Sequence, residues 1–163
     1  MQIRSNFKLI NMKQISFFFL LMLLVGFSTS PESTYELDQL VDAWHKNASE
    51  AQFDAYFSKT HADFVFIGTA PNERWSKTDF MAFSKPYFDR GKAWDFTPKN
   101  RKWNFSSDGK TAWFDEELDT WMRGCRATGI MVKVKKEWKL IHYDLHVLIE
   151  NEKMDAFLLL RDQ

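Results

Sequence analysis

Cysteine is almost absent from this 163-residue sequence, since Cys125 stands alone. A single thiol excludes an intrachain disulfide and a cysteine-rich metal site, so we expect it to fill a buried position. The chain also lacks a glycine-rich phosphate loop, a helical metal-binding motif and a serine-nucleophile elbow, which disfavours nucleotide chemistry and serine hydrolysis. No stripe of basic residues interrupts the balance of 22 basic and 22 acidic side chains, so a nucleic-acid partner is disfavoured too.

Long hydrophobic runs are also scarce. The run at residues 15–27 (ISFFFLLMLLVGF) is shorter than the roughly 20 residues that a membrane-spanning helix needs. Basic residues precede it and small polar residues follow it, which is the pattern of a signal peptide. We therefore expect residues 1–28 to be cleaved during export and residues 29–163 to form one domain. The mature protein is expected to be periplasmic or secreted, without a permanent membrane anchor.

Aromatic residues, in contrast, are abundant: they make up 17% of the chain, with 16 Phe and 7 Trp. This content favours a core of large rings, which could either fill the interior or surround a cavity. Four of these residues are candidates for the wall of an apolar ligand pocket, with plain core packing as the alternative: Trp44, Tyr56, Trp75 and Trp94.

Hydrophobic spacing predicts three helices followed by a series of strands. The helices are expected at about residues 33–51, 52–58 and 76–91, with Ser33 and Ser76 as N-caps and a break or kink at Pro86. Strands are expected at about residues 64–67, 94–105, 111–118, 125–134 and 138–149. Helices first and strands afterwards indicate an α+β domain with helices on one face of an antiparallel sheet.

Several phrases, in their order along the chain, resemble the SnoaL-like group of the nuclear transport factor 2-like superfamily. They are Asp63-Phe-Val-Phe-Ile-Gly-Thr69, Glu73-Arg-Trp75, Lys92-Ala-Trp94, Ala112-Trp-Phe114 and Trp138-Lys-Leu-Ile-His-Tyr143. The resemblance covers about residues 35–151 and leaves a tail at 152–163. It implies a cone in which N-terminal helices pack on a strongly curved antiparallel sheet around a pocket, often in a homodimer. It implies no single activity, because relatives include cyclases, an isomerase, a dehydratase and association modules.

The last predicted strand carries the main candidates for chemistry. His142, Asp144 and His146 alternate with apolar residues, so all three lie on one face. If that face looks into the pocket, Asp144 could act as a base with His142 as acid or hydrogen-bond donor, and His146 could contact the ligand. A structural role for the histidines is the alternative. The trio also offers metal-ligand chemistry, but no fourth ligand is evident, so neither a metal nor another cofactor is expected.

Glu116 and Arg126 lie on strands that should be neighbours. They are expected either to form a cross-strand ion pair or to point inward, where Arg126 could hold a carboxylate or enolate oxygen.

Taken together, these features predict an exported, dimeric SnoaL-like protein that binds a small, partly apolar ligand. Two alternatives stay open: a cofactor-independent enzyme of proton transfer, such as an isomerase, cyclase or dehydratase, and a protein association module. The tail contains a cluster of Phe157 and three leucines, which should be covered by the domain or by a second subunit.

Overall fold

The computed structural model describes residues 34–161. The predicted signal peptide and the predicted N-cap Ser33 lie outside the described residues. Within them, no helix is both long enough and apolar enough to cross a membrane.

Three helices precede most of the sheet, as the spacing predicts: α2 (Thr34–Ser49), α3 (Phe53–Ser58) and α4 (Lys77–Asp89). The Ser76 cap is present, because its Oγ accepts a hydrogen bond from the backbone N–H of Asp79 at 3.3 Å. Of the break or kink predicted at Pro86, the break is wrong, since α4 continues through this residue to Asp89. Pro86 and Ala82 are both exposed, so the Ala82 carbonyl, which loses its intrahelical donor to the proline, lies on the solvent side of the helix.

Six strands form one sheet in the order β2-β1-β6-β5-β4-β3. The strands are β1 (Thr60–Ile67), β2 (Arg74–Ser76), β3 (Thr97–Phe105), β4 (Thr111–Thr120), β5 (Arg123–Val134) and β6 (Glu137–Val147). All neighbouring pairs are antiparallel except β1 and β6, which run parallel. The sheet is therefore mixed rather than purely antiparallel, and the expected α+β fold of helices on a curved sheet is confirmed.

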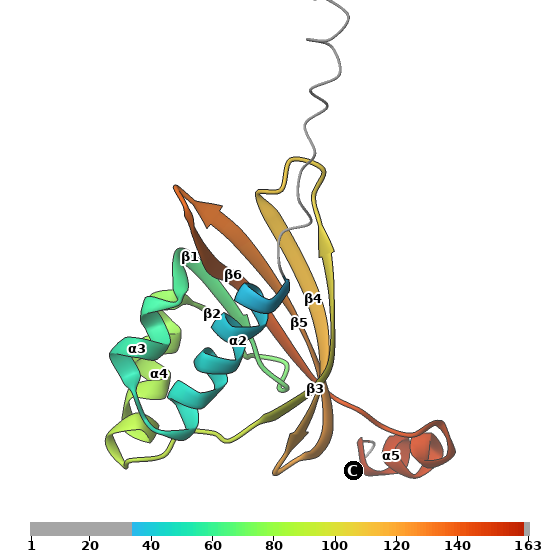
Figure 1. Cartoon of the computed structure of the whole chain (residues 1–163). Coiled ribbons are helices and arrows are strands. Elements are labelled where there is room, and N and C mark those ends of the chain that lie inside the picture. The colour runs from blue at the N-terminus through green and yellow to red at the C-terminus, as the bar shows by residue number, and fades with distance from the viewer. Residues whose placement is uncertain (1–33, 162–163) are drawn as a thin grey trace, which may run out of the picture. The chain divides into compact units, whose positions relative to one another are not determined.

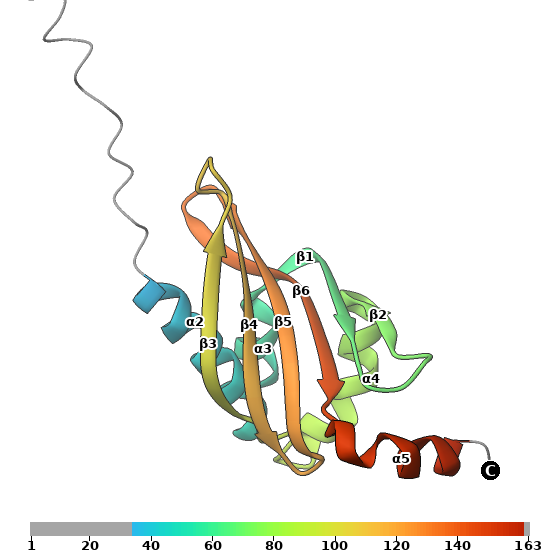
Figure 2. The ribbon, with the colours of Figure 1, turned by 90° about the vertical axis from the view of Figure 1, so that its right-hand side faces the viewer.

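The three helices cover a single face of this sheet, and the strands curve around them (Figures 1 and 2). Strand residues alternate accordingly: in β4, Phe114, Glu116 and Leu118 are buried, whereas Asp115 and Glu117 are exposed on the other face. We call these the inner and outer faces of the sheet.

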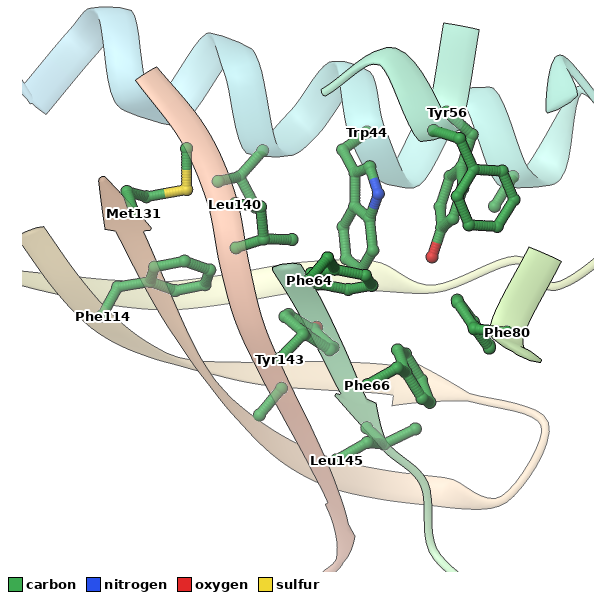
Figure 3. Close-up of a cluster of buried hydrophobic side chains, with 14 of the residues drawn as sticks. Trp44, Tyr56, Phe64, Phe66, Phe80, Phe114, Met131, Leu140, Tyr143 and Leu145 are labelled. Carbon is green, nitrogen blue, oxygen red and sulfur yellow. The ribbon is translucent and has the colours of Figure 1, made fainter. Parts of the chain in front are cut away.

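Aromatic rings dominate the core between helices and sheet (Figure 3). Trp44 of α2 lies with its ring centroid 4.7 Å from those of both Tyr56 of α3 and Tyr143 of β6. Phe66 of β1 stacks on Phe80 of α4 at 4.1 Å. Cys125 is buried and unpaired, as its solitary occurrence predicts.

The tail forms a short 3-10 helix (Asn151–Lys153) and α5 (Met154–Arg161), which extends beyond the end of β6 (Figure 2). None of its residues is buried, and Leu158, Leu159 and Leu160 are all exposed. The described part of the domain therefore does not cover this leucine cluster.

Close packing between β4 and β5 leaves no room for a side chain at Gly129. A Cβ at Gly129 of β5 would lie 2.3 Å from the Phe114 ring, whereas one at Gly124 of the same strand would meet nothing within 4 Å. We expect Gly129→Ala to lower the unfolding free energy by about 1–3 kcal/mol through overpacking. Urea unfolding of this variant beside Gly124→Ala measures the difference, and equal stability of the two would contradict it.

Candidate functional site

One open, mostly apolar hollow of about 160 Å³ lies where α4 meets the inner face of the sheet. Its wall is formed largely by aromatic side chains, together with Leu145, Met122 and the turn residues Gly68, Thr69 and Glu73. The aromatic members are Phe66, Trp75, Phe80, Phe83, Trp94, Phe96 and Trp121. We call this the aromatic pocket; its size is close to the cavity of about 150 Å³ that accommodates benzene in another protein.

Local structure explains how these rings converge. Trp75 and Glu73 are two residues apart around the start of β2, so the period of the strand turns both toward the pocket and turns Arg74 away. Helix α4 presents Phe80 and Phe83 three residues apart, which places them on one face. The Trp75 ring stacks on Phe83 at 4.4 Å and on Phe80 at 5.7 Å, forming a continuous aromatic wall.

Glu73 is the one ionisable side chain in the wall of the aromatic pocket. Its Oε2 accepts a hydrogen bond from the backbone N–H of Ala70 at 3.0 Å, and its backbone carbonyl accepts one from the N–H of Gly68 at 2.7 Å. A Cβ at Gly68 would lie 2.3 Å from Oε2, so glycine is required for the carboxylate to fold back over this turn. The sequence phrase ending at Trp75 contains Glu73, but nothing in the spacing alone assigned it a role.

A second polar group lies deeper, under α2. Glu116 of β4 is 1% exposed, and its Oε1 accepts hydrogen bonds from His45 Nε2 at 2.7 Å and Tyr143 Oη at 2.9 Å. Its Oε2 accepts from Arg101 Nε at 2.8 Å and lies 2.7 Å from Arg101 Nη2. Arg101 also donates to Asp38 at 3.0 Å and to Asp42 at 2.8 Å.

These contacts keep Glu116 ionised. Burial raises the pKa of Glu116, but the hydrogen bonds and charges of His45 and Arg101 outweigh it and hold the pKa below its usual value. Burial, and then the neighbouring Glu116 carboxylate, raises the pKa of Tyr143, which keeps this hydroxyl a donor. Because four donors occupy its two oxygens, Glu116 is suited to fixing the sheet against α2 and poorly suited to removing a proton from a ligand.

The predicted trio on β6 does share one face, but that face is the outer one. Tyr143 and Leu145 point into the core, and His142, Asp144 and His146 lie opposite, with His146 Nε2 3.5 Å from Asp144 Oδ1. None of the three borders the aromatic pocket. The expectation that this face looks into the pocket is therefore wrong: the apolar side chains of β6 take the inner positions because their burial is favourable. Within residues 34–161, no group of three or more His, Cys, Asp or Glu side chains is arranged to hold a metal ion.

The predicted pairing of Glu116 with Arg126 is also wrong. In the register of β4 and β5, Glu116 lies opposite Ala127, and Arg126 lies opposite Glu117 on the outer face. Arg126 Nη2 approaches Glu117 Oε1 at 3.9 Å, a weak exposed contact. Glu116 points inward without it and takes Arg101 as its partner.

The four predicted wall aromatics separate into two pairs. Trp75 and Trp94 border the aromatic pocket, whereas Trp44 and Tyr56 are buried in the core beside it. Trp44 Nε1 and Tyr56 Oη have no hydrogen-bond partner among the described residues. Buried polar atoms of this kind are ordinarily bonded to internal water.

Residues 37–150 match the family described as the SnoaL-like domain. The match covers most of the chain and nearly all of its described part. The chain belongs to the SnoaL-like family. Several solved structures with the same fold are described as NTF2-like proteins, and no curated protein sequence matches the chain.

Solved structures share this SnoaL-like fold at low sequence identity. A putative dehydratase of the NTF2-like family from Streptomyces avermitilis is 12% identical with a TM-score of 0.64, over 74% of this chain and 100% of that one. An NTF2-like protein from Cytophaga hutchinsonii is 14% identical with a TM-score of 0.60, over 72% and 99%. The association domain of CaMKII from C. elegans is 13% identical with a TM-score of 0.58, over 70% and 95%. At such identities the likeness shows the fold alone.

Besides Glu73, sequence reasoning missed His45 and Arg101 of this SnoaL-like domain. His45 lies four residues after Val41 and three before Ala48, so helical spacing places it on the buried face of α2. That signal could have identified a buried histidine in need of an acceptor. Arg101 carried no comparable signal, because a bulge in β3 between Lys99 and Lys102, with Asn100 at a positive φ of 52°, turns it inward.

Proposed function

We propose that this SnoaL-like protein is exported and binds a small, largely apolar ligand in the aromatic pocket. The observation that carries the proposal is the composition of the pocket wall: stacked aromatic rings with a single carboxylate and no basic side chain. Apolar pockets with a few placed polar groups are typical of small-molecule sites. The volume suits a ligand built around one ring.

The positions of the candidate acid and base groups favour ligand binding over catalysis of proton transfer. Asp144 and His142 lie on the outer face of the sheet, away from this pocket, and Glu116 has both oxygens occupied by donors. Proton abstraction needs a base within hydrogen-bonding reach of the substrate, with a free lone pair. The neighbour described as a putative dehydratase keeps the enzyme alternative open, and Glu73 would then be the base to test.

We further propose a homodimer. Apolar side chains that the described domain leaves exposed support it, among them Trp113 and Ile130 on the outer face of the sheet and the leucines of α5. One structural relative is described as an association domain, and it shares the fold of this chain.

Native mass spectrometry of the protein purified from the exported fraction tests these points together. We expect a mature chain cleaved near residue 28, a dimer, and an additional small organic mass on each subunit. The bound mass should disappear in Trp75→Ala, which removes part of the pocket wall, and persist in Trp113→Ala, which removes an indole from the outer face. An empty, larger assembly would count against a ligand-binding role and favour an association module. A full-length chain in the cytoplasm would contradict export.

A further inference from the structure

The aromatic pocket is lined by groups of negative charge or negative potential. Its wall contains no Lys, Arg or His, and Glu73 is its one ionisable group. The faces of aromatic rings are themselves regions of negative potential, and Trp is the strongest of them. Three Trp rings border the pocket: Trp75, Trp94 and Trp121.

Only one oxygen of the Glu73 carboxylate accepts a hydrogen bond from the described residues. Oε2 accepts the Ala70 N–H, but within residues 34–161 Oε1 has no hydrogen-bond donor and the side chain has no ion-pair partner. Other carboxylates of the chain do have such partners: Asp89 is paired with Lys85, and Asp119 with Lys99. An unpaired carboxylate among apolar rings lacks the cation that would stabilise it.

Trp121 lies at the rim, in the turn between β4 and β5. It borders the pocket but is 80% exposed, which is unusual for so large an apolar side chain. A ligand seated against it would remove much of the indole from water and would gain contact with its face.

We infer that the aromatic pocket takes a cationic ligand, with an apolar or aromatic body and a quaternary or protonated amine directed at Glu73. The inference rests on the proposed ligand-binding function and adds the charge of the ligand. A cation gains from both parts of the wall: the ring faces attract it, and the free Oε1 of Glu73 gives it a counter-charge. A neutral ligand of equal shape gains only the burial of apolar area.

A pair of isosteric probes separates these contributions: phenyltrimethylammonium and tert-butylbenzene, which have nearly the same shape and differ in charge. Binding of each is followed by tryptophan fluorescence, to which the three pocket indoles contribute, and by ligand-observed NMR. We expect the cation to bind at least ten-fold more tightly than the neutral probe. Glu73→Gln, which keeps an oxygen for the Ala70 N–H, should remove most of this preference and leave the neutral probe unaffected. The matched control Glu36→Gln, an exposed carboxylate on α2, changes net charge equally and should retain the preference.

The outcomes also distinguish this inference from the proposed function. Equal binding of the two probes to the wild-type protein would overturn the cationic ligand and leave an apolar-ligand pocket in place. A preference that survives in Glu73→Gln would overturn the role of Glu73. Binding of neither probe would contradict the proposed function itself. Thermal unfolding of both variants confirms that any loss reflects the site rather than the fold.

Discussion

Arg101→Met is expected to lower the unfolding free energy by about 3–5 kcal/mol, because it leaves the Glu116 carboxylate buried without its cation. Few single changes in the chain should have a larger effect, since a domain of this size is stable by only about 5–15 kcal/mol. Urea unfolding at neutral pH measures the loss. The control is Lys102→Met, which removes a base from the exposed side of the same strand and should change stability by less than about 0.5 kcal/mol.

The pH dependence of this loss tests its cause. The folded-state pKa of Glu116 is depressed, so its ionised form stabilises the fold above the unfolded-state pKa, and this stabilisation is lost as the pH falls through the folded-state value. The gap between wild type and Arg101→Met should therefore narrow as the pH falls toward and through the depressed folded-state pKa of Glu116, because the carboxyl group becomes protonated there. The double variant Arg101→Met with Glu116→Met should recover part of the stability. A gap independent of pH would show that lost packing, rather than an unpaired charge, causes the effect.

Phe80→Ala is expected to lower the unfolding free energy by about 3–5 kcal/mol. Phe80 is 1% exposed and lies at the junction of the core and the aromatic pocket, with its ring centroid 4.1 Å from Phe66 and 5.6 Å from Trp94. Its removal leaves a cavity that these rings can only partly fill, and it opens the pocket toward the core. Thermal and urea unfolding measure the loss.

The matched control for Phe80 is Phe83→Ala, one turn further along α4. Phe83 borders the same pocket but is 39% exposed, so its removal forms no enclosed cavity and should destabilise by about 1 kcal/mol. Equal losses in the two variants would contradict the burial argument. A wider pocket in Phe80→Ala should also admit two-ring apolar probes that the wild type excludes.

Much of the fold could be predicted from the sequence because its signals are local. Helical spacing in α2, the Ser76 cap and the alternation along β4 each depend on neighbouring residues, and the structure contains all three. The parallel pairing of β1 with β6 could not be predicted in this way, since it joins segments far apart in the chain.

The candidate site was less predictable, because it depends on which face of each strand is buried and on strand register. Alternation placed His142 and Asp144 on one face but could not say that this face is the outer one. A shift of one residue between β4 and β5 decides that Arg126 meets Glu117 rather than Glu116. The Arg101 partner depends on a bulge, and the Glu73 carboxylate on a turn, and neither feature has a periodic signal.

The parallel pair of β1 and β6 also determines when the chain can complete its fold during synthesis. Val65 pairs with His142, so β1 leaves the ribosome long before its partner strand exists. Until residues up to Val147 have emerged, β1 is not joined to the sheet formed by β3, β4 and β5, and the nascent chain exposes aromatic side chains that β6 later covers. Assembly must therefore wait for the C-terminal strand. We expect ribosome-bound chains that end before β6 to be protease-sensitive and to depend on a holding chaperone.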